Sequence, residues 1–299
     1  MSKKNKILRK ICSVIGRNYP TSWMKLRYFL RYKKPLNLKN PKTLNEKILY
    51  LSLTKDNPLW TELSDKYKVR EYVKEKIGED KLVKLYGKWT NANDIDFDKL
   101  PDKFVLKTNH GSGEIKIVKD KSKLDIPATI KYFNEEIRRP YGELEGGRHY
   151  WGIKPLIIAE ELLENDPETL KYSNSLIDYK CWCFNGKCQF VWVCKNRTKD
   201  GTEVMTYDLD WNPHPEWSIF TSHYRKGTPI PKPGNLHEII QIAEKLSKPF
   251  PVVRVDLYSV NNKIYFGEMT FTSLGGLMNF FTKEFLEMSG NMIDLNYNG

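Results

Sequence analysis

Acidic residues are missing from the first 45 positions of the chain. Glu46 is the first acid, whereas 13 of the 49 lysines and arginines lie before it. The remainder therefore holds 36 basic against 37 acidic residues, and the net charge of +12 belongs to this one segment. A nucleic-acid enzyme more often spreads its basic residues along a groove. We therefore expect no nucleic acid among the partners.

Long apolar runs are absent as well. No stretch of about 18 apolar residues occurs, so the sequence predicts no membrane-spanning helix. The N-terminus has a basic start, but its short apolar core is interrupted by Arg9 and Lys10, which is not the pattern of a signal peptide. Cysteine is scarce, and the odd number of five is typical of a reduced protein. These absences predict a cytoplasmic location.

Internal repeats and low-complexity linkers are also missing. The 299 residues are 40% hydrophobic and 13% aromatic, which predicts a globular chain with a large core. A capping box at Thr43–Glu46 predicts the start of a helix, and further helices are expected over 62–77, over 125–138 and after Asn235. Strands are expected over 81–86, 104–118, 155–163, 178–197 and 252–270, and residues 198–234 are interpreted as a long loop.

Aromatic residues interleave with the cations of the acid-free segment, for example Trp23 with Lys25 and Phe29 with Arg31. This mixture suits an anionic membrane surface or an acidic polymer. A solvated helix pair packed against the body of the protein would show the same pattern. All three interpretations remain open, and the first would place the protein at the inner face of a membrane.

The rest of the chain is organised around residues 252–276, VVRVDLYSVNNKIYFGEMTFTSLGG. Two strand-like runs flank an Asn-Asn turn, and each holds one carboxylate, Asp256 or Glu268. A buried, unpaired carboxylate is costly, and two facing carboxylates repel each other unless a cation lies between them. One interpretation is a magnesium site for a polyphosphate. The other is a surface hairpin with its acids in water.

The turn allows the register of this hairpin to be predicted. A plain two-residue turn would place Asp256 opposite Gly267 and direct Glu268 to the other face, because side chains alternate along a strand. One added residue, such as a bulge at Gly267, places Asp256 opposite Glu268 and Arg254 opposite Thr270.

A glycine loop, Gly111-Ser112-Gly113, follows a strand that carries Lys107. Such a loop brings backbone N–H groups onto phosphates, and a lysine supplies a point charge. The loop lacks the Walker and dinucleotide patterns, so an ordinary turn is an alternative. His110 would orient a phosphate or be incidental.

Residues 178–197 are predicted to form a hairpin about Asn185-Gly186. A two-residue turn pairs Lys180 with Val191 and Asp178 with Val193. That register places three cations on one face with Asp178, and such a face would attract an anion. The C-x-C spacing on the other face does not match a zinc knuckle, so its thiols are interpreted as core residues. The basic face carries Asp178, Lys180, Lys195 and Arg197. The other face carries Cys181, Cys183, Cys188, Phe190 and Trp192.

The order of these motifs resembles the TupA-like ATP-grasp family of polysaccharide and teichuronopeptide biosynthesis. The resemblance covers residues 37–290 and is carried by PKTLNEKI, DKYKVREYV, LPDKFVLKTNHGSG, IIAEELL, DYKCWCFNGK, YDLDW and FPVVRVDLYSVNNKIYFGEMTF. It implies an α+β ATP-grasp fold in which two lobes clamp ATP. The implied division is a short basic helical segment over 1–60, a first lobe over 61–160 and a second lobe over 161–299.

The resemblance also implies roles for the candidate residues. Asp256 and Glu268 would bind Mg²⁺, and Thr270 stands where many relatives have an asparagine ligand, which leaves a second metal open. Arg254 or Arg197 would stabilise an oxyanion. The implied ATP contacts are Lys66, Lys107 and Lys180 on the phosphates, Gly111, Ser112 and Gly113 in a flap, and Glu160, Glu161, Leu162 and Leu163 at adenine and ribose.

The activity implied is an ATP-dependent carboxylate–amine ligase that works through an acyl phosphate. Its substrates would be a sugar acid of a surface polysaccharide or its precursor, and an amino acid or amine. The alternative is a metal-dependent glycosyltransferase in which Asp208 and Asp210 form a D-x-D motif. That alternative gives no role to Lys107, the glycine loop or the paired acids.

Overall fold

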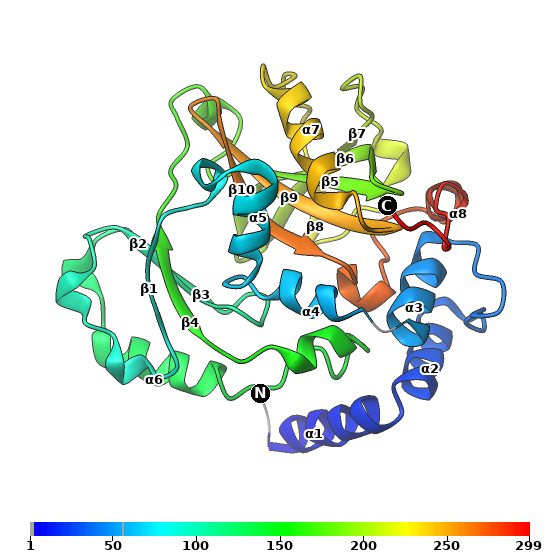
Figure 1. Ribbon diagram of the computed structural model, residues 1–299, viewed down its shortest axis with the longest axis horizontal. Coiled ribbons are helices and arrows are strands. Elements are labelled where there is room, and N and C mark those ends of the chain that lie inside the picture. Colours follow the sequence, from blue (N-terminus) through cyan, green and yellow to red (C-terminus); the bar gives the residue numbers. More distant parts are fainter. Residues whose placement is uncertain (1–2, 56) are drawn as a thin grey trace.

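The computed structural model describes residues 3–55 and 57–299, so residues 1, 2 and 56 of the expected N-terminal segment lie outside the described residues. Two β-sheets form two lobes with helices packed on them (Figure 1). The sequence elements that carry the candidate residues come from both sheets. The mixed α+β architecture agrees with the prediction.

The first sheet is four-stranded and antiparallel, in the order β1-β4-β2-β3. Its core is apolar on one face, where Phe104 and Leu106 pack with Phe133 of α6. The alternation of buried and half-buried residues along FVLKT explains why this segment is a strand. The elements are β1 (Leu85–Trp89), β2 (Phe104–Thr108), β3 (Ile115–Val118), α6 (Ile126–Glu136) and β4 (Ile157–Glu161).

The second sheet is six-stranded, in the order β10-β9-β5-β6-β7-β8, and only β8 runs parallel to its neighbour. Helix α7 packs its apolar stripe against this sheet, and its Leu246 is fully buried. The elements are β5 (Asp178–Phe184), β6 (Lys187–Thr198), β7 (Gly201–Tyr207), β8 (Tyr224–Lys226), α7 (Leu236–Ser247), β9 (Val252–Val260) and β10 (Lys263–Thr270).

The remaining helices surround the two sheets, and α1 and α2 (blue) form an outer arm along the lower edge of the molecule (Figure 1). The predicted capping box is confirmed, because Thr43 and Glu46 bond to each other's backbone amides at the start of α3. Among the described residues, no helix has both the length and the apolar character needed to cross a membrane. These helices are α1 (Lys3–Asn18), α2 (Pro20–Tyr32), α3 (Leu44–Thr54), α4 (Pro58–Ser64), α5 (Val69–Ile77) and α8 (Lys283–Asn291).

The predicted register of the β9–β10 hairpin is confirmed. Glu268 pairs with Asp256 and Thr270 pairs with Arg254, and the register shifts by one residue at Gly267. A Cβ at position 267 would lie 2.9 Å from the Asp256 carbonyl oxygen, so glycine allows the close approach of the bulge. The bulge brings both carboxylates to the same face of the sheet.

The predicted register of the β5–β6 hairpin is wrong beyond its turn. Cys183 does face Cys188, but a bulge follows and Lys180 pairs with Trp192 rather than Val191. Trp192 and Cys194 therefore line a cavity together with Lys180. Lys195 points away from it and bonds to Glu203 at 2.8 Å.

Other element boundaries also differ from the predictions. The helix expected over 62–77 is broken between α4 and α5, because the Asp65 carboxylate accepts from the amides of Tyr67 and Lys68. The strand expected over 81–86 begins later, at Leu85. The long loop expected over 198–234 contains β7 and β8. Asn235 precedes α7 as expected, but its amide side chain donates to Ser259 and makes no cap bond.

Candidate active site

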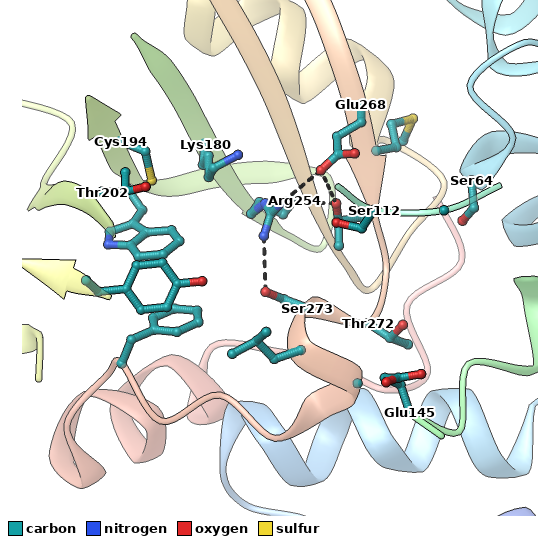
Figure 2. A pocket seen from close by; sticks show the side chains of 18 of the residues that line it. Ser64, Ser112, Glu145, Lys180, Cys194, Thr202, Arg254, Glu268, Thr272 and Ser273 are labelled. Atoms are coloured by element: carbon teal, nitrogen blue, oxygen red, sulfur yellow. Dashed lines mark hydrogen bonds and ion pairs between the residues drawn. The ribbon is translucent and has the colours of Figure 1, made fainter. Parts of the chain in front are cut away.

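A cavity of about 530 Å³ brings together side chains from both lobes. The first lobe supplies Gly111 and Ser112 of the glycine loop, and the second supplies cations and a carboxylate from β5, β9 and β10. Arg254 lies in the middle of this group, bonded to Glu268 and Ser273 (Figure 2). The predicted site residues that line the cavity are Lys66, Gly111, Ser112, Lys180, Arg197, Arg254, Glu268 and Thr270.

Arg254 is buried and holds Asp256 with two parallel bonds. Its Nε lies 2.7 Å from Asp256 Oδ1, and one terminal nitrogen lies 2.8 Å from Oδ2. The same terminal nitrogen is 3.1 Å from Glu268 Oε1 and 3.1 Å from the Thr270 hydroxyl. A guanidinium therefore contacts both carboxylates. The pattern is a bidentate pair, which fixes the direction of the arginine.

Lys180 completes the cluster from the neighbouring strand. Its ammonium bonds to Asp256 and lies 3.5 Å from Asp178, which also holds Arg197. Burial opposes the charge of Lys180, but the two aspartates outweigh it and raise the pKa of the lysine above its usual value. Lys180 therefore remains a cation at the wall of the cavity.

Glu268 faces the cavity from β10. Burial alone would raise the pKa of Glu268, but Lys66, Arg254 and Lys180 outweigh it and lower that pKa to about 2. The bonds that Glu268 makes within the described chain run through Oε1. The carboxylate is thus ionised at neutral pH, with its other oxygen turned to no described hydrogen-bond donor.

The donor set fits a magnesium ion that takes most of its ligands from elsewhere. In the described part of the chain, no group of three or more histidine, cysteine or acidic side chains is arranged to hold a metal by itself. Both oxygens of Asp256 are engaged by Arg254 and Lys180. Mg²⁺ is commonly held by one or two carboxylates together with substrate phosphates and water. Glu268, with the Thr270 hydroxyl beside it, fits that arrangement.

Lys66 contacts the glycine loop and lies near this carboxylate. It lies at the break between α4 and α5, and its Nζ donates to the Gly111 carbonyl at 2.5 Å. Burial lowers the pKa of Lys66, whereas the nearby Glu268 raises it. The break at Asp65 thus turns this lysine toward the cavity.

Asn109 is a positioning residue that sequence reasoning missed. Its amide nitrogen donates to Asp65 at 2.8 Å, and its amide oxygen accepts from the backbone of Leu156 at 2.6 Å. Its carbonyl also accepts from the backbone of Lys66. One buried side chain therefore ties the glycine loop, the helix break and the start of β4 together. Asn109 belongs to the motif TNHGSG, which stands out in the sequence for its glycines. The role of Asn109 follows only from its partners far along the chain.

The first sheet holds the remaining predicted ATP contacts outside this cavity. Lys107 Nζ lies 2.5 Å from Glu160, which also pairs with Arg70 at 3.3 Å. Glu161 at the end of β4 is exposed, and Leu162 and Leu163 after it are half-buried.

His110 is buried, and its ring nitrogen bonds to the Arg139 carbonyl rather than facing the cavity. Gly113 has a φ of +96°, which favours glycine in this loop.

Aromatic residues form a second part of the cavity wall that the sequence did not predict. Trp192 and Phe280 stack with ring centroids 4.4 Å apart, and Tyr224 packs edge-on against both. All three line the cavity. They come from β6, from β8 and from the segment before α8, so the signal was spread over distant parts of the chain.

Gly275 shapes another part of the wall. Its φ is +64°, and a Cβ at this position would lie 2.7 Å from the Glu145 carbonyl oxygen. We expect Gly275→Ala to lower the free energy of unfolding by about 1–3 kcal/mol, because both the backbone and the contact are strained. Thermal unfolding would measure this, with Gly234→Ala as the control, since a Cβ at 234 meets open space. Equal unfolding temperatures for the two variants would contradict the expectation.

The D-x-D motif of the alternative interpretation forms a turn instead. Asp208 Oδ1 accepts from the Asn212 backbone at 2.8 Å, and Oδ2 accepts from the Asn212 side chain at 2.9 Å. His214 also lies 3.2 Å from Oδ2. Asp210 is exposed after the end of β7. Neither acid lines the cavity that holds Arg254 and Glu268.

Several solved structures are similar to this chain. D-Alanine–D-alanine ligase from Bacillus anthracis, complexed with ATP, aligns over 70% of this chain and 55% of its own, with 16% identity and a TM-score of 0.42. The Helicobacter pylori enzyme aligns over 79% of this chain and 60% of its own, with 14% identity and a TM-score of 0.41. N5-carboxyaminoimidazole synthase from Aspergillus clavatus, in complex with ADP and 5-aminoimidazole ribonucleotide, aligns over 70% of this chain and 44% of its own, with 10% identity and a TM-score of 0.41. This chain thus spans less than two thirds of each of these proteins.

A sequence profile places the chain more specifically. The profile of the TupA-like ATP-grasp family matches residues 46–294, which is most of the chain. No curated protein matches the sequence. The profile match confirms the predicted resemblance and the ATP-grasp fold with its two α+β lobes. The chain belongs to the TupA-like ATP-grasp family.

Proposed function

We propose that this protein is an ATP-dependent carboxylate–amine ligase. The observation that carries the proposal is the convergence of Lys66, Lys180 and Arg254 on one cavity with Glu268 and the glycine loop. Three cations there would receive the phosphates and the substrate carboxylate. Glu268, an ionised carboxylate beside them, provides a site for the magnesium that accompanies ATP.

The reaction proceeds in two displacements. A carboxylate oxygen of the acceptor attacks the γ-phosphorus of ATP, the bond to the β-phosphate oxygen breaks, and ADP leaves with an acyl phosphate in place. The amine then attacks the acyl carbon, loses a proton, and expels phosphate to give an amide. Magnesium held by Glu268 and the Thr270 hydroxyl would supply charge neutralisation for the phosphates. Lys66 and Lys180 neutralise further charge.

Arg254 is the favoured oxyanion stabiliser. Its remaining nitrogen donates to Ser273 at 3.1 Å, so the guanidinium is held by four different side chains. A donor fixed in advance stabilises developing charge without reorganising. Arg197 is a second candidate, because it lines the cavity and is held by Asp178.

We propose a sugar acid as the acceptor, in a surface polysaccharide of capsular or teichuronic type, and an amino acid or amine as the other substrate. The wall of Trp192, Tyr224 and Phe280 supports a ring-shaped substrate, because aromatic faces pack against the apolar face of a sugar. Arg197 beside this wall would pair with its carboxylate. The proposed division is a basic segment over 1–60 and lobes over 61–160 and 161–299. The proposed location is the cytoplasm, at the inner membrane face.

Lys107 is proposed to contact the ATP phosphates, with Glu160 to Leu163 at adenine and ribose and the loop from His110 to Gly113 over the phosphates. We expect Lys107→Met to weaken ATP binding about 10- to 100-fold, because a charge-assisted contact is lost. The fold should persist, since Glu160 keeps Arg70. Calorimetric titration with ATP measures the effect, and Lys103→Met is the control because Lys103 pairs at the surface with Glu164. Unchanged affinity would remove Lys107 from the site.

The proposed function is tested by product formation. Purified protein is incubated with ATP and Mg²⁺ and with a matrix of uronic acids and amino acids, and ADP is measured. We expect release of ADP that requires both an acid and an amine. Release of a nucleoside diphosphate from a sugar nucleotide, with no use of ATP, would favour the glycosyltransferase alternative at Asp208 and Asp210.

A further inference from the structure

Helices α1 and α2 present apolar side chains to solvent. On each helix three of them recur at the i, i+3, i+4 spacing of one face. Together with Tyr19, which lies between the two helices, they account for nearly half of the large apolar residues that are exposed in the described chain, although they fall within 20 positions. Seven such side chains are 39–67% exposed, and they are Ile11, Val14, Ile15, Tyr19, Leu26, Phe29 and Leu30.

The opposite sides of both helices are packed, so this orientation is fixed. Met24 and Tyr28 of α2 are buried in a small core with Leu49 and Leu277. On α1, a Cβ at Gly16 would lie 2.2 Å from the Glu143 carbonyl oxygen, which shows how closely that side approaches the body. The apolar stripes therefore cannot turn inward without breaking these contacts.

The charged residues of the two helices themselves are all of one sign. Lys25, Arg31, Lys33 and Lys34 are exposed on or just after α2, and no acid occurs before Glu46. Two copies of this chain meeting on these helices would bring acid-free segments together, and their repulsion disfavours a dimer here. An acidic polymer would use the cations but leave the apolar side chains in water. An anionic bilayer matches both features.

We propose that α1 and α2 form a docking element for an anionic lipid bilayer. The stripes of Ile11, Ile15, Leu26, Phe29 and Leu30 enter the boundary between headgroups and acyl chains, and the surrounding cations contact the headgroups. This contact does not depend on the chemistry of the cavity and extends the function beyond the ligase reaction.

The docking helices also hold one wall of the catalytic cavity. Trp23 donates to the Leu144 carbonyl at 2.9 Å, Arg27 bonds to the same oxygen, and Arg17 pairs with Glu143 at 3.4 Å. The adjoining Glu145 lines the cavity and also a second cavity beside Arg27 and Arg31. Docking thus holds the catalytic cavity near the membrane. If the proposed ligase function holds, an acceptor carried by the membrane would reach it there.

The test is sedimentation of the full chain with vesicles of phosphatidylcholine, with or without phosphatidylglycerol, at low and high salt. We expect wild type to pellet with the anionic vesicles, partly resisting high salt because apolar insertion is not screened. Leu26→Ser, Phe29→Ser and Leu30→Ser combined should weaken binding at least about tenfold. Leu170→Ser with Ile219→Ser is the matched control, since both residues are similarly exposed elsewhere.

A second variant separates charge from apolar contact. Lys25→Glu, Lys33→Glu and Lys34→Glu combined should remove the preference for anionic vesicles, with thermal unfolding confirming that each variant is folded. Equal pelleting of wild type and the serine variant would overturn the proposal. So would binding of wild type to polyglutamate without binding to anionic vesicles. ADP release measured without vesicles reports the ligase function separately, so failure of one does not imply failure of the other.

Discussion

Glu268→Gln is expected to lower turnover about 10²- to 10³-fold or more while leaving the fold intact. The amide has the size of the carboxylate but not its charge, which magnesium requires. The pKa of Glu268 is lowered to about 2, so the wild-type group stays ionised throughout the neutral range. The pH profile of the wild-type enzyme should therefore show no loss of activity from this group above about pH 5.

The control for this variant is Glu203→Gln on the same sheet. Glu203 pairs with a buried cation, Lys195, as Glu268 pairs with Arg254, but it lies outside the cavity. Initial rates of ADP release and thermal unfolding are measured for both proteins. Near-normal turnover of the Glu268→Gln protein would show that the metal is held elsewhere.

Arg254→Met is expected to affect both stability and activity. Removing the guanidinium leaves Asp256 buried with Lys180 as its remaining described cation, and breaking such a pair costs about 3–5 kcal/mol. Turnover should be lost, because the proposed oxyanion donor is gone. Denaturant unfolding and ADP release measure the two effects.

Arg254→Lys separates charge from geometry. Lysine keeps the positive charge, so it should recover part of the stability, but one ammonium cannot reproduce the fork that bonds both oxygens of Asp256. We expect turnover to stay at least about 100-fold below wild type. A methionine variant as stable as wild type, or a lysine variant with normal turnover, would contradict the role given to Arg254.

The sequence predicted the β9–β10 hairpin because its determinants are local. The Asn261-Asn262 turn and the glycine before Glu268 are enough to place the two acids opposite each other, and the observed register agrees. The family profile and the α+β fold were predictable for a related reason, since the motifs follow one another in a fixed order.

The predicted register of the β5–β6 hairpin is wrong because the contacts that determine it come from distant parts of the chain. Beyond the turn, Phe190 packs against Phe281 and Phe285, and Trp192 stacks on Phe280, about 90 residues away. These contacts favour the bulge that turns Trp192 and Cys194 toward the cavity. Strand alternation alone cannot include them.

The prediction of one continuous helix over 62–77 is wrong for the same reason. Residues 62–77 have helical spacing, but the Asp65 carboxylate is held by Asn109, 44 positions along the chain. This long-range bond competes with helical hydrogen bonding and positions Lys66. The predicted metal site depends on two facing acids, Asp256 and Glu268. In the structure Arg254 bonds to both of them. The predicted pairing of Arg254 with Thr270 places the arginine near the two acids but does not show that it bonds to both.

The central claim is that a substrate carboxylate is activated by phosphoryl transfer. Its most direct test uses an acceptor acid whose carboxylate carries ¹⁸O, incubated with ATP, Mg²⁺, the amine and the enzyme. The mechanism predicts that one labelled oxygen passes into inorganic phosphate for each amide formed, because the acyl phosphate breaks between carbon and oxygen. Amide formation with unlabelled phosphate would contradict the account.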